Sequence, residues 1–150
     1  MIPHVLGVLG LVGGGVVAGV FVAVAVSVFP TLCALPAGPY VELHRELGQR
    51  YHPIMPLVVN GAMCANVALA VLTGGAARGL FAGAATLLLG TQFVSHLGNV
   101  PLNRSMRNLD SRAIPADWRD PRPVWRGLHL LRTTLALLAL VATAIAVTLG

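Results

Sequence analysis

The chain has 150 residues, of which 56% are hydrophobic and 10% are charged, and its mean hydropathy is +0.80. A soluble globular domain needs more polar surface than this composition provides, so the sequence indicates a membrane protein. The net charge of +5 comes from arginines, since the chain contains no lysine. No basic patch with interleaved aromatic residues accompanies that charge, which argues against nucleic acid as a partner.

Four apolar stretches predict an all-α fold, an integral membrane four-helix bundle of antiparallel spans with a short amphipathic helix in the first connection. A helix of roughly 20 apolar residues crosses a bilayer, so four spans and their connections use nearly the whole chain as one domain. The spans are expected at about residues 5–29, 54–72, 80–100 and 124–149.

The first span is rich in glycine and includes Gly15 and Gly19, four residues apart. Glycines at this spacing allow a neighbouring helix to approach closely, so we expect these two to lie in a helix contact. The stretch is too long for the apolar region of a signal peptide and has no basic segment before it, which favours a retained span. Pro30 is expected to end the helix.

The first connection is predicted to form an amphipathic helix over residues 41–49, at the rim of the bundle. Glu42 and Glu46 lie one turn apart on this helix and are expected to face water. His44 points in a different direction from the leucines of the same helix. His52 follows just before the second span.

The second span carries Asn60 and Asn66 among apolar residues. Buried asparagines in membrane helices usually form hydrogen bonds between helices, and we expect that here. The glycine-rich residues 73–79 then predict a tight turn, which makes the second and third spans antiparallel neighbours.

Two polar stripes are predicted where the third span ends and the fourth begins. Steps of four, three and four residues separate Gln92, His96, Asn99 and Asn103, which share one face if the helix continues past Pro101. Steps of four and three separate Trp125, His129 and Arg132. We expect the stripes to face a common cavity, because lipid would leave Arg132 and His129 without hydrogen-bond partners.

The arginines predict the orientation of the bundle. The first and third connections hold seven arginines, whereas the N-terminus and the second connection hold only Arg78. The positive-inside rule therefore places the arginine-rich side in the cytoplasm and both termini outside. The histidines of that cytoplasmic end are His44, His52, His96 and His129.

Arg132 allows two interpretations. It extends to the membrane surface, or it faces the cavity as a fixed positive charge for an anionic or enolate-like oxygen. In the second case His129 and His96 are candidates for proton transfer, since imidazole titrates near neutral pH. The alternative for each histidine is a structural hydrogen bond. If a metal binds, its ligands are expected among the four histidines of the cytoplasmic end, and copper or iron suits imidazole; a site without a cofactor stays open.

Several short motifs of this chain resemble those of the anthrone-oxygenase-like family of small bacterial and fungal membrane proteins. They are Ser27-Val28-Phe29-Pro30, Asn99 before Pro101-Leu102-Asn103, and Trp125 followed by His129 and Arg132. The resemblance covers essentially the whole chain and implies an oxygenase of secondary (polyketide) metabolism that converts an anthrone to an anthraquinone with molecular oxygen. We expect the protein in a bacterial inner (plasma) membrane.

The resemblance points to Asn99, Asn103, Trp125, His129 and Arg132 as site residues, and the depth of the helices adds His52 and His96. In this hypothesis a histidine removes a proton, while Arg132 and an asparagine hold the resulting oxyanion. Trp125, Gln92 and His44 are expected to contact the lipophilic substrate.

Two other kinds of function remain open from the sequence. In the first, the bundle binds a quinone-like molecule without catalysing a reaction. In the second, it is an accessory subunit of a larger membrane complex. A homo-oligomer is compatible with each alternative. Oxygen consumption distinguishes the enzyme from a binding protein.

Overall fold

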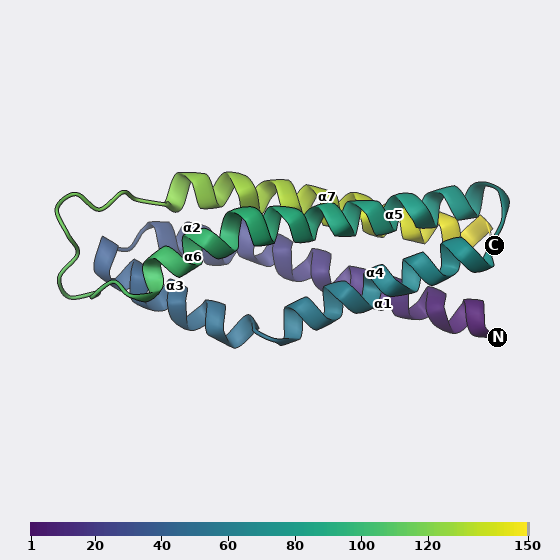
Figure 1. Ribbon diagram of the computed structural model, residues 1–150, viewed down its shortest axis with the longest axis horizontal. Helices are drawn as coiled ribbons and strands as arrows, with labels where there is room; N and C mark the ends of the chain where they lie inside the picture. Colours follow the sequence, from purple (N-terminus) through teal and green to yellow (C-terminus); the bar gives the residue numbers. More distant parts are fainter. Residues whose placement is uncertain (150) are drawn as a thin grey trace.

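The computed structural model describes residues 1–149 and is built from helices (Figure 1). Four helical stretches are long and apolar enough to span a membrane, which confirms the predicted fold class. The elements are α1 (Ile2–Ala23), η1 (Val24–Val28), α2 (Phe29–Cys33), α3 (Ala37–Tyr51), α4 (Ile54–Leu72), α5 (Gly75–Val94), η2 (Ser95–Asn99), α6 (Val100–Arg107) and α7 (Arg122–Leu149).

The helices form a closed ring in which α1 contacts α4, α4 contacts α5, α5 contacts α7 and α7 contacts α1. Both chain termini and the turn between α4 and α5 lie at one end of this elongated bundle, called here the terminus end (Figure 1). The helix α3 and the long segment 108–121 lie at the opposite end, called here the loop end.

Glycines on one face of α1 allow close packing. Gly7, Gly10 and Gly14 are buried, and their spacing of three and four residues places them on a single helix face. The expected contact at Gly15 and Gly19 is wrong, because a Cβ at either position would meet nothing within 4 Å. The contact face of α1 is rotated from the predicted one.

Two π-helical segments make the first and third spans longer than the sequence predicts. The Phe29 N–H bonds the Val24 carbonyl and the Val100 N–H bonds the Ser95 carbonyl, five residues back in each case. Each wide turn lies two residues before a proline, Pro30 or Pro101. In a regular helix the proline ring clashes with the carbonyl four residues earlier, and the wide turn relieves this clash. The first helix therefore continues through Pro30 to Cys33 instead of ending at Pro30.

The connecting helix α3 is also longer than the predicted 41–49. Its bundle-facing side chains are Tyr40, Val41 and His44, which are all buried. Leu43 lies on the other side and is 38% exposed. The polar His44 therefore turns toward the bundle, while Glu42 and Glu46 are exposed as expected.

Candidate functional site

Trp125 is the centre of an aromatic cluster at the loop end of the bundle. Phe29 stacks on it with ring centroids 4.6 Å apart, and His129 stacks on it at 4.9 Å. His44 meets the same indole edge-on at 5.2 Å. The cluster thus joins the first span, α3 and α7 through one buried side chain.

The side chain of Asn103 ties this cluster to α6. Its Oδ1 accepts hydrogen bonds of 3.0 Å from the Trp125 Nε1–H and from His44 Nε2. An indole nitrogen only donates, so the atom that it contacts must be the amide oxygen. It follows that His44 donates through Nε2, and that its Nδ1 carries the lone pair.

His129 is fully buried and uses both ring nitrogens. Its Nδ1 accepts a hydrogen bond of 2.9 Å from Arg132 Nε, and its Nε2 donates to the Phe21 carbonyl at 3.0 Å. Because arginine only donates, this arrangement fixes the neutral tautomer with the proton on Nε2. His129 therefore links α1 to α7 and orients Arg132.

Arg132 is partly buried in the bundle and has no carboxylate partner among the described residues. Its other contacts are a 3.4 Å hydrogen bond from Nη1 to Ser95 Oγ and the ring faces of Phe21 and Trp125, whose centroids lie 4.7 and 5.5 Å from Cζ. Among residues 1–149 the ion pairs are Arg50–Glu46 and Arg122–Asp120, both elsewhere. The guanidinium is held by neutral groups, so its charge stays uncompensated.

The two π-helical segments border this polar cluster. The Phe21 carbonyl that accepts the hydrogen bond from His129 Nε2–H lies in α1 just before η1, and Ser95 and Asn99 lie within η2. Asn99 is 1% exposed, and its Nδ2 lies 3.4 Å from the Trp125 carbonyl. Wide turns of this kind recur at functional sites, because they re-aim groups that a regular helix would keep in register.

Three polar atoms of the loop end are buried without a hydrogen-bond partner among the described residues. They are Tyr40 OH, His44 Nδ1 and Asn99 Oδ1. Tyr40 and His44 are in contact, with ring centroids 5.3 Å apart. Buried polar atoms are normally paired, so these three atoms have hydrogen-bonding capacity that no protein group of residues 1–149 uses.

Burial also sets the charge states of α3. It lowers the pKa of His44, against the opposing effect of the Asn103 hydrogen bond and with a further decrease from the positive Arg132. Burial raises the pKa of the Tyr40 hydroxyl. At neutral pH both side chains are therefore uncharged.

Three of the expected site residues lie outside this cluster. His52 and His96 are exposed, and Gln92 bonds Asn60 of α4 at 2.7 Å. His96 Nδ1 lies 2.9 Å from the carbonyl of Gln92. The single stripe expected from Gln92 to Asn103 is wrong, because the wide turn adds a residue and rotates the later part of the helix by about 100°. Asn99 and Asn103 face the cluster, and His96 does not.

The histidines likewise do not assemble as metal ligands. Within residues 1–149 no three His, Cys, Asp or Glu side chains lie close enough together to hold an ion. His129 has both nitrogens engaged, and His52 and His96 are exposed. The donor set expected from the sequence therefore does not fit the coordination shell of a metal.

A cavity of about 400 Å³ lies beside the cluster, between α6, the segment before α7 and the start of α7. Its lining is largely apolar and consists of Leu102, Ser105, Leu109, Trp118, Arg119, Asp120, Pro121 and Val124. Leu102 and Trp118 also pack against the buried core that contains Trp125. The hollow is open to its surroundings, and the residues that line it do not include Trp125, His129 or Arg132.

Sequence reasoning missed several parts of this site. Tyr40 gave no signal, because an isolated tyrosine before a charged helix resembles an interfacial anchor. The Phe21 carbonyl is a backbone group and leaves no trace in the sequence. Ser95 lies directly beside His96 in the polar stretch, but it does not belong to the stripe that helical spacing selects, which is Gln92, His96, Asn99 and Asn103.

A sequence model of the family described as anthrone oxygenase matches residues 45–142, which is more than half of the chain and includes α7 as far as Ala142. No curated protein and no solved structure matches the chain.

Proposed function

Because this chain belongs to the anthrone oxygenase family, we propose that it is a membrane-embedded oxygenase acting on a lipophilic aromatic ketone of the anthrone type. Its site is the cluster of Trp125, His129, Arg132, Asn99 and Asn103, with His44 beside them. In the reaction, the methylene carbon of the substrate becomes a carbonyl. One atom of molecular oxygen enters that carbonyl, and the other leaves as water with the two methylene hydrogens.

The observation that carries this proposal is the guanidinium of Arg132, which lies inside the bundle with no carboxylate near it. Its partners are His129 Nδ1 and Ser95 Oγ, both neutral. A fixed positive charge in surroundings of low dielectric constant stabilises negative charge that develops during a reaction. Loss of a methylene proton places such charge on the ketone oxygen of an anthrone, and the resulting electron-rich carbon reacts with oxygen.

The aromatic side chains supply the rest of the binding surface. Phe21, Phe29 and Trp125 surround the polar groups with ring faces. Phe29 and His129 stack on the Trp125 indole and all three rings are buried, so a flat lipophilic substrate from the bilayer would have to displace one of these contacts to stack there. The side-chain amides of Asn99 and Asn103 are the neutral groups able to orient the oxygens of the substrate.

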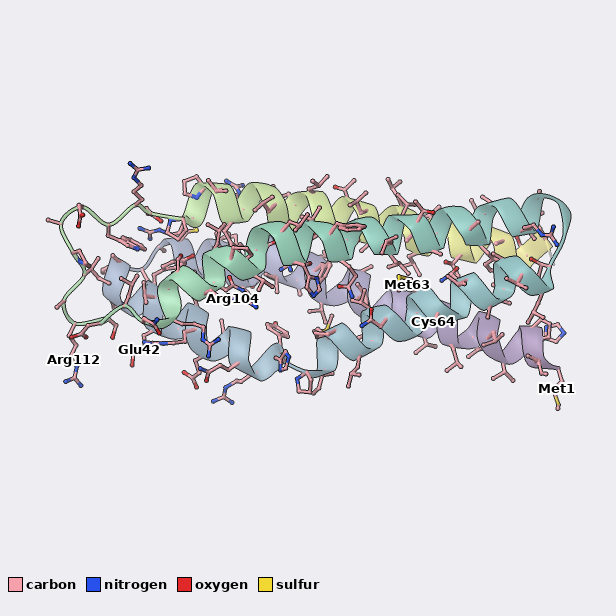
Figure 2. All side chains as sticks on the ribbon, in the orientation of Figure 1. Met1, Glu42, Met63, Cys64, Arg104 and Arg112 are labelled. Atoms are coloured by element: carbon pink, nitrogen blue, oxygen red, sulfur yellow. The ribbon has the colours of Figure 1, made fainter. Side chains whose placement is uncertain are left out.

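The proposal places the loop end on the cytoplasmic side of a bacterial inner membrane, with both termini outside. Arg104 and Arg112 lie at the loop end and Met1 lies at the opposite end (Figure 2). An excess of arginine on one side of a bundle is the usual mark of its cytoplasmic face. A reporter fused to the C-terminus that is active only outside the cytoplasm would agree with this orientation.

Oxygen consumption tests the function. Purified protein in lipid nanodiscs is mixed with anthrone in an oxygen-electrode cell, and anthraquinone is followed by absorbance. We expect consumption of one oxygen molecule per anthrone, faster than without protein. Binding of anthrone with no increase in oxygen uptake would instead favour a non-catalytic binding protein, and purification only with other subunits would favour an accessory subunit.

A further inference from the structure

The two buried histidines of the cluster differ in what their nitrogens can still do. His129 has no free lone pair, because Nδ1 accepts from Arg132 and Nε2–H donates to Phe21. A general base needs a lone pair that is not already engaged in a hydrogen bond with the protein. His129 could act as a base only after Arg132 had left it.

His44 has the lone pair that His129 lacks. Its Nε2–H is held by Asn103 Oδ1 at 3.0 Å, and the donor-only indole of Trp125 fixes the orientation of that amide. Its Nδ1 is buried and has no partner. The side chain is 6% exposed, so the lone pair is shielded from bulk water and held in one direction by its neighbours.

We infer that His44 is the group that takes the proton from the substrate, while His129 positions Arg132. This inference rests on the proposed function. His44 and Arg132 both contact the indole of Trp125, at 5.2 and 5.5 Å from its ring. His44 Nδ1 and Asn99 Oδ1 are buried acceptors that receive no hydrogen bond from the described residues, so a substrate that reaches His44 meets a base close to the cation of Arg132.

The proton transfer to His44 begins the oxidation of the substrate. A methylene C–H bond of the substrate breaks, its proton goes to His44 Nδ1, and the electron pair is delocalised onto the ketone oxygen near Arg132. Molecular oxygen adds to the carbanion, and His44 returns its proton to the oxygen-derived group. Loss of the second methylene hydrogen and cleavage of the O–O bond then give the new carbonyl and one molecule of water.

Hydrogen exchange without oxygen isolates this proton step. Anthrone is incubated anaerobically with the protein in D₂O buffer, and deuterium in its methylene group is measured by mass spectrometry. We expect the wild-type protein to accelerate exchange, and His44→Gln to lose about 100-fold or more of that acceleration. The glutamine amide keeps a donor for Asn103 and lacks a basic nitrogen. His4→Gln makes the same change at an exposed position of the terminus end and should behave as wild type.

The outcomes separate the inference from the proposed function. If wild-type protein consumes oxygen with anthrone and His44→Gln exchanges at the wild-type rate, the assignment of His44 fails and the oxygenase stands. If wild-type protein neither exchanges nor consumes oxygen, the oxygenase itself fails.

A measurement on wild-type protein covers the case in which His44→Gln does not fold. The nitrogen-15 resonance of His44 Nδ1 should move when anthraquinone is added, because the ligand approaches that atom. An Nδ1 resonance that stays unchanged with bound anthraquinone would overturn the assignment.

Discussion

The bundle contains two buried polar clusters, one at each end, and they are built in opposite ways. At the terminus end, Thr143 Oγ1 lies 2.9 Å from Asn66 Oδ1 and 2.9 Å from the Ala139 carbonyl, and Asn66 Nδ2 donates to the Ala62 carbonyl at 2.9 Å. Every side-chain polar atom there has a partner, and no member is charged. At the loop end the cluster holds the unpaired charge of Arg132 and three orphaned polar atoms.

The difference separates groups that hold helices together from groups that are left available. A neutral, fully paired hydrogen bond between membrane helices contributes modestly to stability and binds nothing else. A partly buried charge without a counter-ion and buried lone pairs without donors carry a desolvation cost, which a bound ligand offsets. The terminus cluster therefore stabilises the fold, and the loop cluster is the proposed site.

The largest effect is expected from removing the charge of the loop cluster. Arg132→Met should lower turnover of anthrone by about 10²–10³-fold, the usual loss when a group that stabilises a developing oxyanion is deleted. Arg132→Lys should retain part of the activity. Lysine keeps the charge but lacks the planar guanidinium that donates hydrogen bonds to both His129 and Ser95. Oxygen uptake in nanodiscs measures both variants.

Arg126→Met is the matched control for these variants. Arg126 is an exposed arginine six residues earlier on the same helix, α7. Its loss should leave turnover within a few-fold of wild type. Full activity of Arg132→Met would mean that the unpaired charge is not part of the site, and the contrast between the clusters would lose its functional meaning.

The sequence predicted the fold because hydrophobic length is decisive in a bilayer. The second span was placed at 54–72, where α4 lies, and the fourth began within two residues of α7. The errors at Pro30 and Pro101 share one physical cause. A proline ordinarily breaks a helix, but a wide turn two residues before each of these prolines allows the helix to continue. The hydrophobic pattern of the sequence does not predict such a turn.

The same turns explain how much of the site could be predicted. Asn103, Trp125, His129 and Arg132 lie together as expected, because each lies on a helix face whose period is regular locally. His96 was misplaced since its spacing to Asn99 crosses η2. His44 was assigned to the site, but its free Nδ1 depends on Asn103 and Trp125, two residues that are distant in sequence.

The next largest effect is expected at the close contact between α1 and α4. A Cβ at Gly13 would lie 3.1 Å from the Cβ of Ala62. A Cβ atom cannot move without the backbone that carries it, so this contact cannot relax as a flexible side chain would. A Cβ at Gly15 would meet nothing within 4 Å. Gly13→Ala should therefore destabilise the protein by about 1–3 kcal/mol. Gly15→Ala, two residues away on the same helix, should not destabilise it, since alanine favours the helix. Unfolding by denaturant in mixed micelles gives both values, and equal stabilities would contradict this packing of α1 against α4.

The strength of the hydrogen bond between Asn66 and Thr143 at the terminus end can be measured directly. A double-mutant cycle of Asn66→Ala and Thr143→Val should give a coupling energy of about 0.6 kcal/mol, the average for hydrogen bonds between membrane helices. Oxygen uptake by the folded single variants should equal that of wild type. A loss of turnover that exceeds the loss of folded protein would show that the two clusters are coupled, and the division of labour between them would be wrong.

The smallest effect is a difference in pH response, because only the loop cluster contains a titratable lone pair. The pKa of His44 is lowered in the folded protein by burial and by Arg132, so its unfolded form, with a pKa of about 6.5, binds protons more readily. Stability is then complete above about pH 6.5 and decreases as the pH falls toward the lowered pKa. The groups against His44 are Tyr40 on α3, which stays uncharged, Arg132 on α7, which stays charged, and Asn103 on α6, which does not titrate.

His44→Gln isolates this contribution from the other histidines. Free energies of unfolding measured at about pH 7.5 and pH 5 should differ less in the variant than in wild type. Asn66→Ala should show the wild-type difference, because the terminus cluster has no group that titrates. If His44→Gln keeps the full pH response, the pKa of His44 is the same in the folded and the unfolded protein, and its Nδ1 is not a buried acceptor without a partner. In that case only the charge of Arg132 would still distinguish the loop cluster from the terminus cluster.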